Sequence, residues 1–160
     1  MNLSLRPAAL LAALALSPPL SAQSPDLSLA PLLDTLGYAY EVDEDGDYRL
    51  LMEVPDSGRT QFVFVRSPVE EFGSTLVREV WSPAWEAEGE FPADVANHLL
   101  QASAGLKLGG WMRHGRHAVM VVKIPAAADA FALGDAISAA AMAADQMELE
   151  LGGPDAEDAY

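Results

Sequence analysis

The segment 38–81 constrains the fold most, because its apolar residues recur at every second position and not at helical spacing. Residues 38–42 and 48–54 largely alternate apolar with polar side chains, and Asp45-Gly46 between them is a hairpin signal. Half-buried strands joined by a tight turn have this pattern. Further strands are predicted at 62–65, where continuous β-favouring residues indicate a central strand covered on both faces, and at 76–81 after a loop with Pro68 and Gly73. The segment therefore predicts an antiparallel meander of three or four strands.

Segments with apolar residues at spacings of three and four lie before, within and after these strands, as amphipathic helices require. The first helix is expected to end at Gly37 and the second to begin near Pro92. Two more strands are predicted at 108–112 and 118–124. The last helix has the clearest apolar stripe, formed by Leu133, Ile137, Ala140, Ala144, Met147 and Leu151. The order α-β-β-β(-β)-α-β-β-α favours an α+β fold in which an antiparallel sheet packs on helices.

The composition limits both the size and the chemistry of the protein. The 160 residues suit one domain, predicted at 27–151 and followed by an acidic disordered tail at 152–160. With 51% hydrophobic residues, the chain can form a substantial core. The absence of cysteine excludes disulfides, thiolate metal sites and cysteine nucleophiles. A formal charge of -15, from 24 acidic and 9 basic residues, argues against a nucleic-acid partner.

The segment 1–22 has the features of a secretory signal peptide. Arg6 precedes an uninterrupted apolar run at 8–16, and small residues follow it. The run is about half of the ~20 residues that span a bilayer, so we expect no stable membrane insertion after cleavage, with a retained anchor as the alternative. Cleavage is expected between Ala22 and Gln23, and the mature protein is predicted to be periplasmic or secreted.

The residues that most often carry catalysis or bind metals form no complete motif. The sequence has neither a G-x-S-x-G nucleophile motif nor a G-x-x-x-x-G-K phosphate loop. The acidic segment 43–47 lacks the glycine and glutamate positions of an EF-hand and is interpreted as a hairpin turn, with weak cation binding as the alternative. His114 and His117 flank a predicted turn with Arg116 between them, which favours a solvated turn over a zinc site completed by His98. No metal, cofactor or catalytic residue is predicted.

The partner-binding candidates are aromatic and apolar side chains. Trp81, Trp85 and Phe91 belong to a segment with acidic neighbours that is predicted to be a loop, and tryptophan is enriched at binding hot spots. The alternative is that these rings close the edge of the core. Met142 and Leu149 are seven residues apart, off the main stripe of the last helix, and would either form a homodimer seam or be scattered exposed residues.

Several short strings on these elements point to a family. They are Leu33-x-x-Leu36-Gly37-Tyr38, Asp45-Gly46-Asp47-Tyr48, Arg59 to Val65, Leu99-Leu100, Gly110-Trp111 and Ala143-Ala144-Asp145-x-x-Glu148. In this order and spacing, over residues 29–151, the chain resembles the YbjN family of bacterial sensory transduction regulator-like proteins, whose fold is like that of type III secretion chaperones. The family has no established enzymatic activity, and its fold relatives bind other polypeptides.

The resemblance implies an exported, non-catalytic module of chaperone-like or regulatory character that binds a polypeptide. The acidic surface is expected to keep the domain soluble and to favour a basic partner. The alternative from another class is a periplasmic protein that binds a small ligand or performs metal-assisted hydrolysis with His98, His114 and His117.

Overall fold

The computed structural model describes residues 23–55 and 57–153, which form the α+β fold that the sequence predicts. The predicted signal segment, with its cleavage point after Ala22, and residues 154–160 of the predicted tail lie outside the described residues. The described elements are α1 (Leu29–Leu36), β1 (Glu41–Val42), β2 (Tyr48–Glu53), β3 (Thr60–Phe72), β4 (Thr75–Glu86), α2 (Ala93–Ser103), β5 (Gly110–His114), β6 (His117–Pro125) and α3 (Ala130–Gly152).

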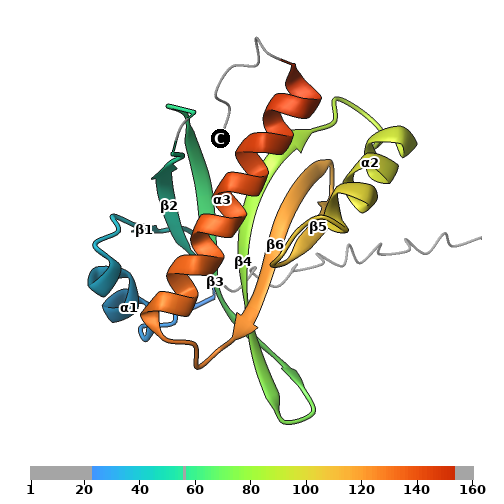
Figure 1. Cartoon of the computed structure of the whole chain (residues 1–160). Coiled ribbons are helices and arrows are strands. Elements are labelled where there is room, and N and C mark those ends of the chain that lie inside the picture. The colour runs from blue at the N-terminus through green and yellow to red at the C-terminus, as the bar shows by residue number, and fades with distance from the viewer. Residues whose placement is uncertain (1–22, 56, 154–160) are drawn as a thin grey trace, which may run out of the picture.

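All six strands belong to one antiparallel sheet with the order β1-β2-β3-β4-β6-β5. The first four strands form the predicted meander, and the β5–β6 hairpin adds to its far side through β6 (Figure 1). The predicted order of helices and strands is therefore confirmed, with four strands in the first group.

Several predicted boundaries are wrong; β3 is longer than the predicted 62–65, and β5 begins and ends two residues later than the predicted 108–112. β1 has two residues instead of the predicted 38–42, β4 extends to Glu86, and Pro68 lies inside β3 instead of in a loop. The strand accommodates Pro68 because the register between β3 and β4 shifts at this point and β2 does not pair with β3 beyond Val65. A proline, which has no amide hydrogen to donate, is tolerated at such bulges.

Helix α3 covers one face of the sheet and lies across β3, β4 and β6 (Figure 1). Every residue of the predicted stripe is buried except Leu151 near the end of the helix, which is partly exposed. Ala136, Ala140 and Ala144 are fully buried, and their short side chains allow the helix backbone to lie close to the strands. At its start, the Asp129 carboxylate caps the helix by accepting a 2.9 Å hydrogen bond from an amide of the first turn.

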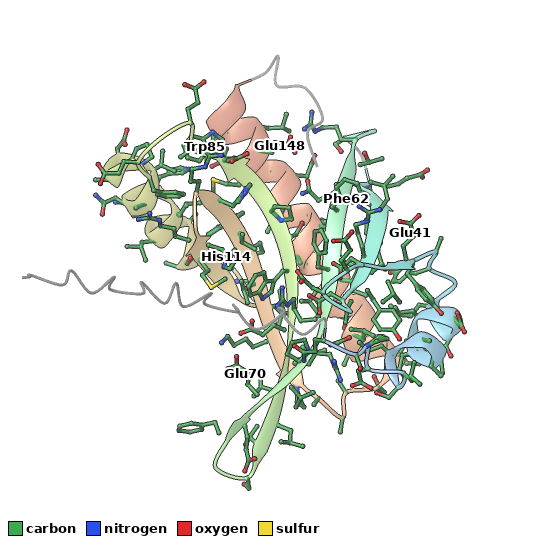
Figure 2. The ribbon with its side chains drawn as sticks, turned by 180° about the vertical axis from the view of Figure 1, so that it is seen from behind. Glu41, Phe62, Glu70, Trp85, His114 and Glu148 are labelled. Carbon is green, nitrogen blue, oxygen red and sulfur yellow. The ribbon has the colours of Figure 1, made fainter. Side chains whose placement is uncertain are left out.

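The two shorter helices extend this helical layer. Helix α1 lies against the start of α3, where a side chain at Gly134 would come within 3.1 Å of Leu36, so the close approach explains a glycine inside the helix. Helix α2 lies against the edge strand β5 and contributes Leu99 to the core. No helix in the described part of the chain is long and apolar enough to cross a bilayer. The face of the sheet opposite α3 carries no helix in residues 23–55 and 57–153 (Figures 1 and 2).

The substitution Ile137→Asp tests the packing of α3 on the sheet. Ile137 has 0% of its surface exposed, so an unpaired carboxylate there should cost several kcal/mol, a large part of a domain's total of about 5–15 kcal/mol. We expect a strongly lowered urea midpoint or no cooperative transition. The control is Phe131→Asp in the first turn of the same helix, which should stay near the wild-type midpoint because Phe131 is 79% exposed. A wild-type midpoint for Ile137→Asp would contradict the packing.

Candidate functional site

The open face of the sheet carries a group of aromatic side chains. Along β3 the odd-numbered positions from Gln61 to Val65 are fully buried under α3, so Phe62 and Phe64 project from the other face. Trp81 on β4 lies opposite Phe64 in the ladder and projects from the same face. Figure 2 views the molecule from this side.

Between these rings lies a hollow of about 310 Å³, which we call the aromatic groove. Its floor consists of side chains from β3, β4 and β6, and one rim is formed by the turn between β5 and β6. The residues that line it are Phe62, Phe64, Arg66, Trp81, Pro83, His114, His117 and Val119. Apolar side chains make up most of this lining, and its three cationic or titratable groups lie among them.

Trp81 is held between two of these polar residues. The Arg66 guanidinium carbon lies 4.4 Å from the centroid of the Trp81 ring, in cation–π geometry. The His114 ring meets Trp81 edge-on at 5.1 Å. Arg66 is fixed in turn by Asp47, whose Oδ2 lies 3.0 Å from the Arg66 Nε. These contacts position Arg66 and Trp81 relative to each other at this end of the groove.

The apolar surface continues from the groove toward the β2 edge of the sheet. Leu51 lies opposite Phe62 in the ladder and is 56% exposed. The Arg49 guanidinium stacks over Phe62 at 5.3 Å and pairs with Glu41 at 2.5 Å. We call Leu51, Phe62, Phe64 and Trp81 the apolar strip.

The predicted loop at 81–91 is wrong, because its first half is strand β4. Trp81 and Trp85 are four residues apart and would share a face in a regular strand, yet they lie on opposite faces here. Trp85 packs at the margin of the core, and its ring meets Phe91 edge-on at 5.7 Å. The sequence therefore grouped three residues that the fold separates: Trp81 lines the groove, and Trp85 and Phe91 lie on the helix side.

A β-bulge causes this separation. Pro83 pairs with Val119 and Trp85 pairs with Ala118, so Ala84 is an extra residue in β4. The buried Gln61 side chain stabilises the bulge by donating a 2.6 Å hydrogen bond from Nε2 to the carbonyl oxygen of Pro83. The extra residue turns Trp85 toward the helices.

The bulge in β3 is stabilised by the buried Arg78. Its Nη1 donates to the carbonyl oxygens of Arg66 at 2.7 Å and Ser67 at 3.1 Å, and its Nη2 pairs with Asp26. Burial favours a higher pKa for Asp26, but hydrogen bonds from Ser28 and the charge of Arg78 together hold that pKa below its usual value. This network attaches the segment before α1 to the sheet.

The acidic segment 43–47 forms the turn between β1 and β2. Asp43 Oδ1 accepts hydrogen bonds from the backbone N–H groups of Asp45 at 3.0 Å and Asp47 at 2.9 Å. Asp47 is 2% exposed, and its burial raises its pKa even though Arg66 and the N–H of Ser67 favour the charged form. Two carboxylates of the turn therefore serve its local structure.

The three histidines do not meet. His98 lies on α2 with its Nε2 2.9 Å from Glu150 of α3, whereas His114 and His117 lie at the β5–β6 turn beside the groove. In the described ranges no group of three or more His, Asp or Glu side chains is gathered closely enough to hold a metal ion.

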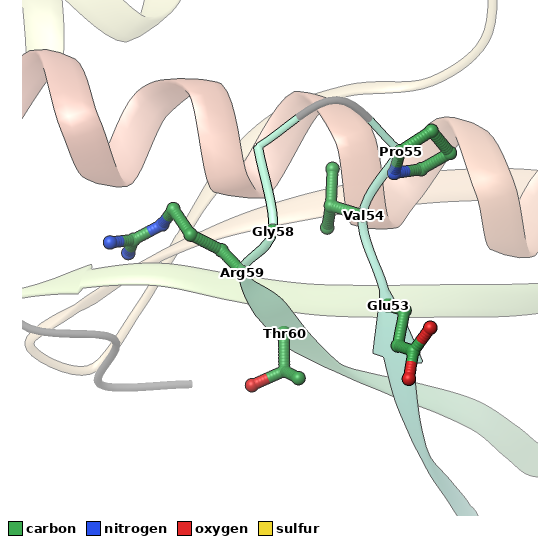
Figure 3. A pocket seen from close by; sticks show the side chains of 6 residues that line it. All are labelled: Glu53, Val54, Pro55, Gly58, Arg59 and Thr60. Carbon is green, nitrogen blue, oxygen red and sulfur yellow. The ribbon is translucent and has the colours of Figure 1, made fainter.

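Met142 and Leu149 lie on α3 and therefore on the side of the sheet away from the groove. Met142 is 53% exposed and Leu149 is partly buried. A second hollow, of about 500 Å³, opens nearby at the β2–β3 turn, lined by Glu53, Val54, Pro55, Gly58, Arg59 and Thr60 (Figure 3).

Arg59, which lines this second hollow, forms ion pairs with helix α3. Its Nε lies 2.8 Å from Asp145, and its Nη2 lies 3.1 Å from Glu148. Because both carboxylates belong to α3 and are almost fully buried, Arg59 connects the β2–β3 turn to the helix. The aromatic groove is therefore the better candidate for a binding site.

Comparison with models of protein families, with curated protein sequences and with solved structures finds no match to this chain. The resemblance to the YbjN family thus stays a prediction from the quoted strings.

Of the groove residues, the sequence interpretation included only Trp81 among the partner-binding candidates, and it gave His114 and His117 a role only in the metal-assisted alternative. Residues 62–65 were expected to be covered on both faces, but only the face toward α3 is covered in the described part of the chain. These groove residues could have been predicted from the alternation of Phe62 and Phe64 with valines, followed by Arg66 two positions later.

The substitution Asp26→Asn tests the Arg78 network, because asparagine keeps an acceptor for Ser28 but removes the charge. At neutral pH the loss of the pair with buried Arg78 should cost about 1–3 kcal/mol of unfolding free energy. Since the folded pKa of Asp26 is lowered, its charge stabilises the fold above the unfolded pKa of about 3.9, and this contribution disappears as the pH falls through the folded value. The cost should therefore shrink in acid.

Chemical denaturation at several pH values between neutral and acid measures this effect. Asp135→Asn on the exposed side of α3 is the control and should change nothing at any pH. A cost for Asp26→Asn that is the same at all pH values would show that the charge is not its source.

The two tryptophans of β4 should differ in their effect on stability. Trp85→Ala should cost about 3 kcal/mol, because it leaves a cavity beside Phe91 at the margin of the core. Trp81→Ala should cost about 1 kcal/mol, because its ring lies on a face that water already reaches. Urea unfolding of both variants checks this order, and the reverse order would contradict the bulge assignment.

Proposed function

We propose that the protein is an exported, non-catalytic module of the YbjN type that binds a polypeptide on the open face of its sheet. The observation that carries this proposal is the aromatic groove with its continuation, the apolar strip, on a face that no helix covers in the described residues. Contiguous exposed apolar surface with a polar rim is typical of interaction sites.

The composition of the groove suits protein recognition. Tryptophan and arginine are the residues most enriched at binding hot spots, and here Arg66 and Trp81 stack on each other. Their geometry is already fixed by Asp47 and His114, so binding would need little further ordering of side chains. An open groove on a sheet face can also accept an extended or helical segment without an enclosed cavity.

The charges favour a partner of different sequence over a second copy. Cations of the open face are paired within the chain: Arg49 with Glu41, Arg66 with Asp47, and Lys123 with Glu79. These pairs neutralise the three cations, while the chain as a whole carries a formal charge of -15. Two such chains would repel each other, whereas a basic or neutral partner would be attracted or tolerated.

A photo-crosslinking amino acid placed at Leu51 tests the proposal in cells that export the protein. Leu51 is exposed on the apolar strip, and Met142, exposed to a similar degree on α3, is the matched control position. We expect a discrete crosslinked polypeptide from position 51 and none from position 142. Crosslinking between two copies through position 142 would instead support the dimer seam, and a small molecule retained in the groove would support the ligand-binding alternative.

The purified partner should then bind Trp81→Ala at least ~2 kcal/mol more weakly than wild type, as hot-spot truncations do. Phe131→Ala is the control, because it removes an equally apolar, 79% exposed ring on the other side of the sheet. Equal affinity for wild type and Trp81→Ala would place the interface elsewhere.

A further inference from the structure

The groove contains a hydrogen-bond donor that the protein itself does not use. Arg66 contacts Asp47 through Nε, but its two terminal nitrogens have no partner among the described residues. Its side chain is 29% exposed, so these nitrogens can be reached from the groove that Arg66 lines. A guanidinium in this position presents a pair of N–H groups that match a carboxylate.

Two imidazoles also line the groove. His114 and His117 are partners in the ladder beside the β5–β6 turn, and both line the groove. His117 Nδ1 is buried and has no hydrogen-bond partner in the described part of the chain. His114 and Arg66 both contact Trp81, so these two groups lie against one ring.

We propose that the aromatic groove binds the C-terminal carboxylate of a partner polypeptide whose last residue is large and apolar. The terminal side chain occupies the hollow between Phe64, Trp81 and Val119, and the carboxylate meets the terminal nitrogens of Arg66. This inference rests on the proposed function, because it specifies which part of the partner enters the groove.

The nearby carboxylates are engaged with other groups and do not occupy the position proposed for the partner's carboxylate. Asp47 is occupied by Arg66 and by the N–H of Ser67. Glu79 accepts a 2.7 Å hydrogen bond from the Trp81 indole and pairs with Lys123 at 2.7 Å. Glu86 pairs with Arg116, and its Oε1 is 3.9 Å from His117 Nε2, the other nitrogen of that ring. In the described ranges, no carboxylate forms a hydrogen bond with the terminal nitrogens of Arg66.

A polypeptide terminus fits this groove better than a free fatty acid. The hollow of about 310 Å³ has room for one large side chain or two smaller ones and lies open on the sheet. The residues before the terminus can run along the apolar strip toward Leu51, which is 56% exposed. A long acyl chain would gain less there, because an open groove leaves much of its surface in water.

The experiment compares two N-acetylated tetrapeptides that end in phenylalanine, one with a free carboxylate and the other with a carboxamide, in an NMR titration of the full-length protein. The carboxylate peptide should bind about tenfold more tightly or better, because it alone forms charge-assisted hydrogen bonds. Its shifts should centre on the Trp81 indole and the amides of the β5–β6 turn. Octanoate, an apolar carboxylate without peptide groups, should bind more weakly than the acid peptide.

Arg66→Gln should remove the preference for carboxylate over carboxamide. Arg49→Gln is the matched control, because Arg49 stacks on an aromatic ring of the same face but, unlike Arg66, already uses a terminal nitrogen to pair with Glu41. Equal binding of both peptides at the Trp81 indole overturns the carboxylate inference and leaves the proposed function intact. Octanoate binding as tightly as the acid peptide overturns the polypeptide source, and absence of binding by the acid peptide overturns the inference whatever the crosslinking from position 51 shows.

Discussion

The packing of α3 on one face of the sheet is the interaction on which the rest of the structure depends. An alanine-rich stripe brings the helix close to three strands at once, and Ile137 and Leu133 fill the remaining space with fully buried side chains. Because α3 is the long helix of the described chain, its position decides which face of the sheet is interior. Phe62, Phe64 and Trp81 are consequently left on the other face, where the described chain provides nothing to cover them.

Two buried polar side chains allow the strands to depart from regular pairing. Gln61 donates to the carbonyl of Pro83 at the bulge in β4, and Arg78 donates to two carbonyls at the bulge in β3. Each of these side chains donates to backbone oxygens that a regular ladder would have paired with N–H groups. A proline, which has no N–H group to donate, lies at each bulge. The bulge in β4 also determines the site, because it sends Trp85 into the margin of the core and keeps Trp81 in the groove.

The chemistry of the groove differs from that of the rest of the surface. The chain is strongly acidic, yet its aromatic groove contains two histidines and an arginine whose terminal nitrogens have no hydrogen-bond partner among the described residues. An apolar floor with unused donors at one end suits a ligand that is itself apolar with one anionic end. This combination connects the proposed polypeptide-binding function to a particular feature of the partner.

The sequence by itself determined the α+β class, the order of elements and the buried stripe of α3, because hydrophobic periodicity and turn signals act over a few neighbouring residues. It also indicated that the tryptophans of residues 81–85 would be either binding residues or core. Only the tertiary structure decided that Trp81 is on the groove side and Trp85 on the helix side, because a one-residue bulge reverses the alternation and leaves no mark in the pattern. Likewise, the sequence pattern at 62–65 is compatible with a strand covered on one face or on both, since coverage depends on helices far away in the chain. The meeting of Arg66, Trp81, His114 and His117 required β3, β4 and the β5–β6 turn to be brought side by side, which no local spacing encodes.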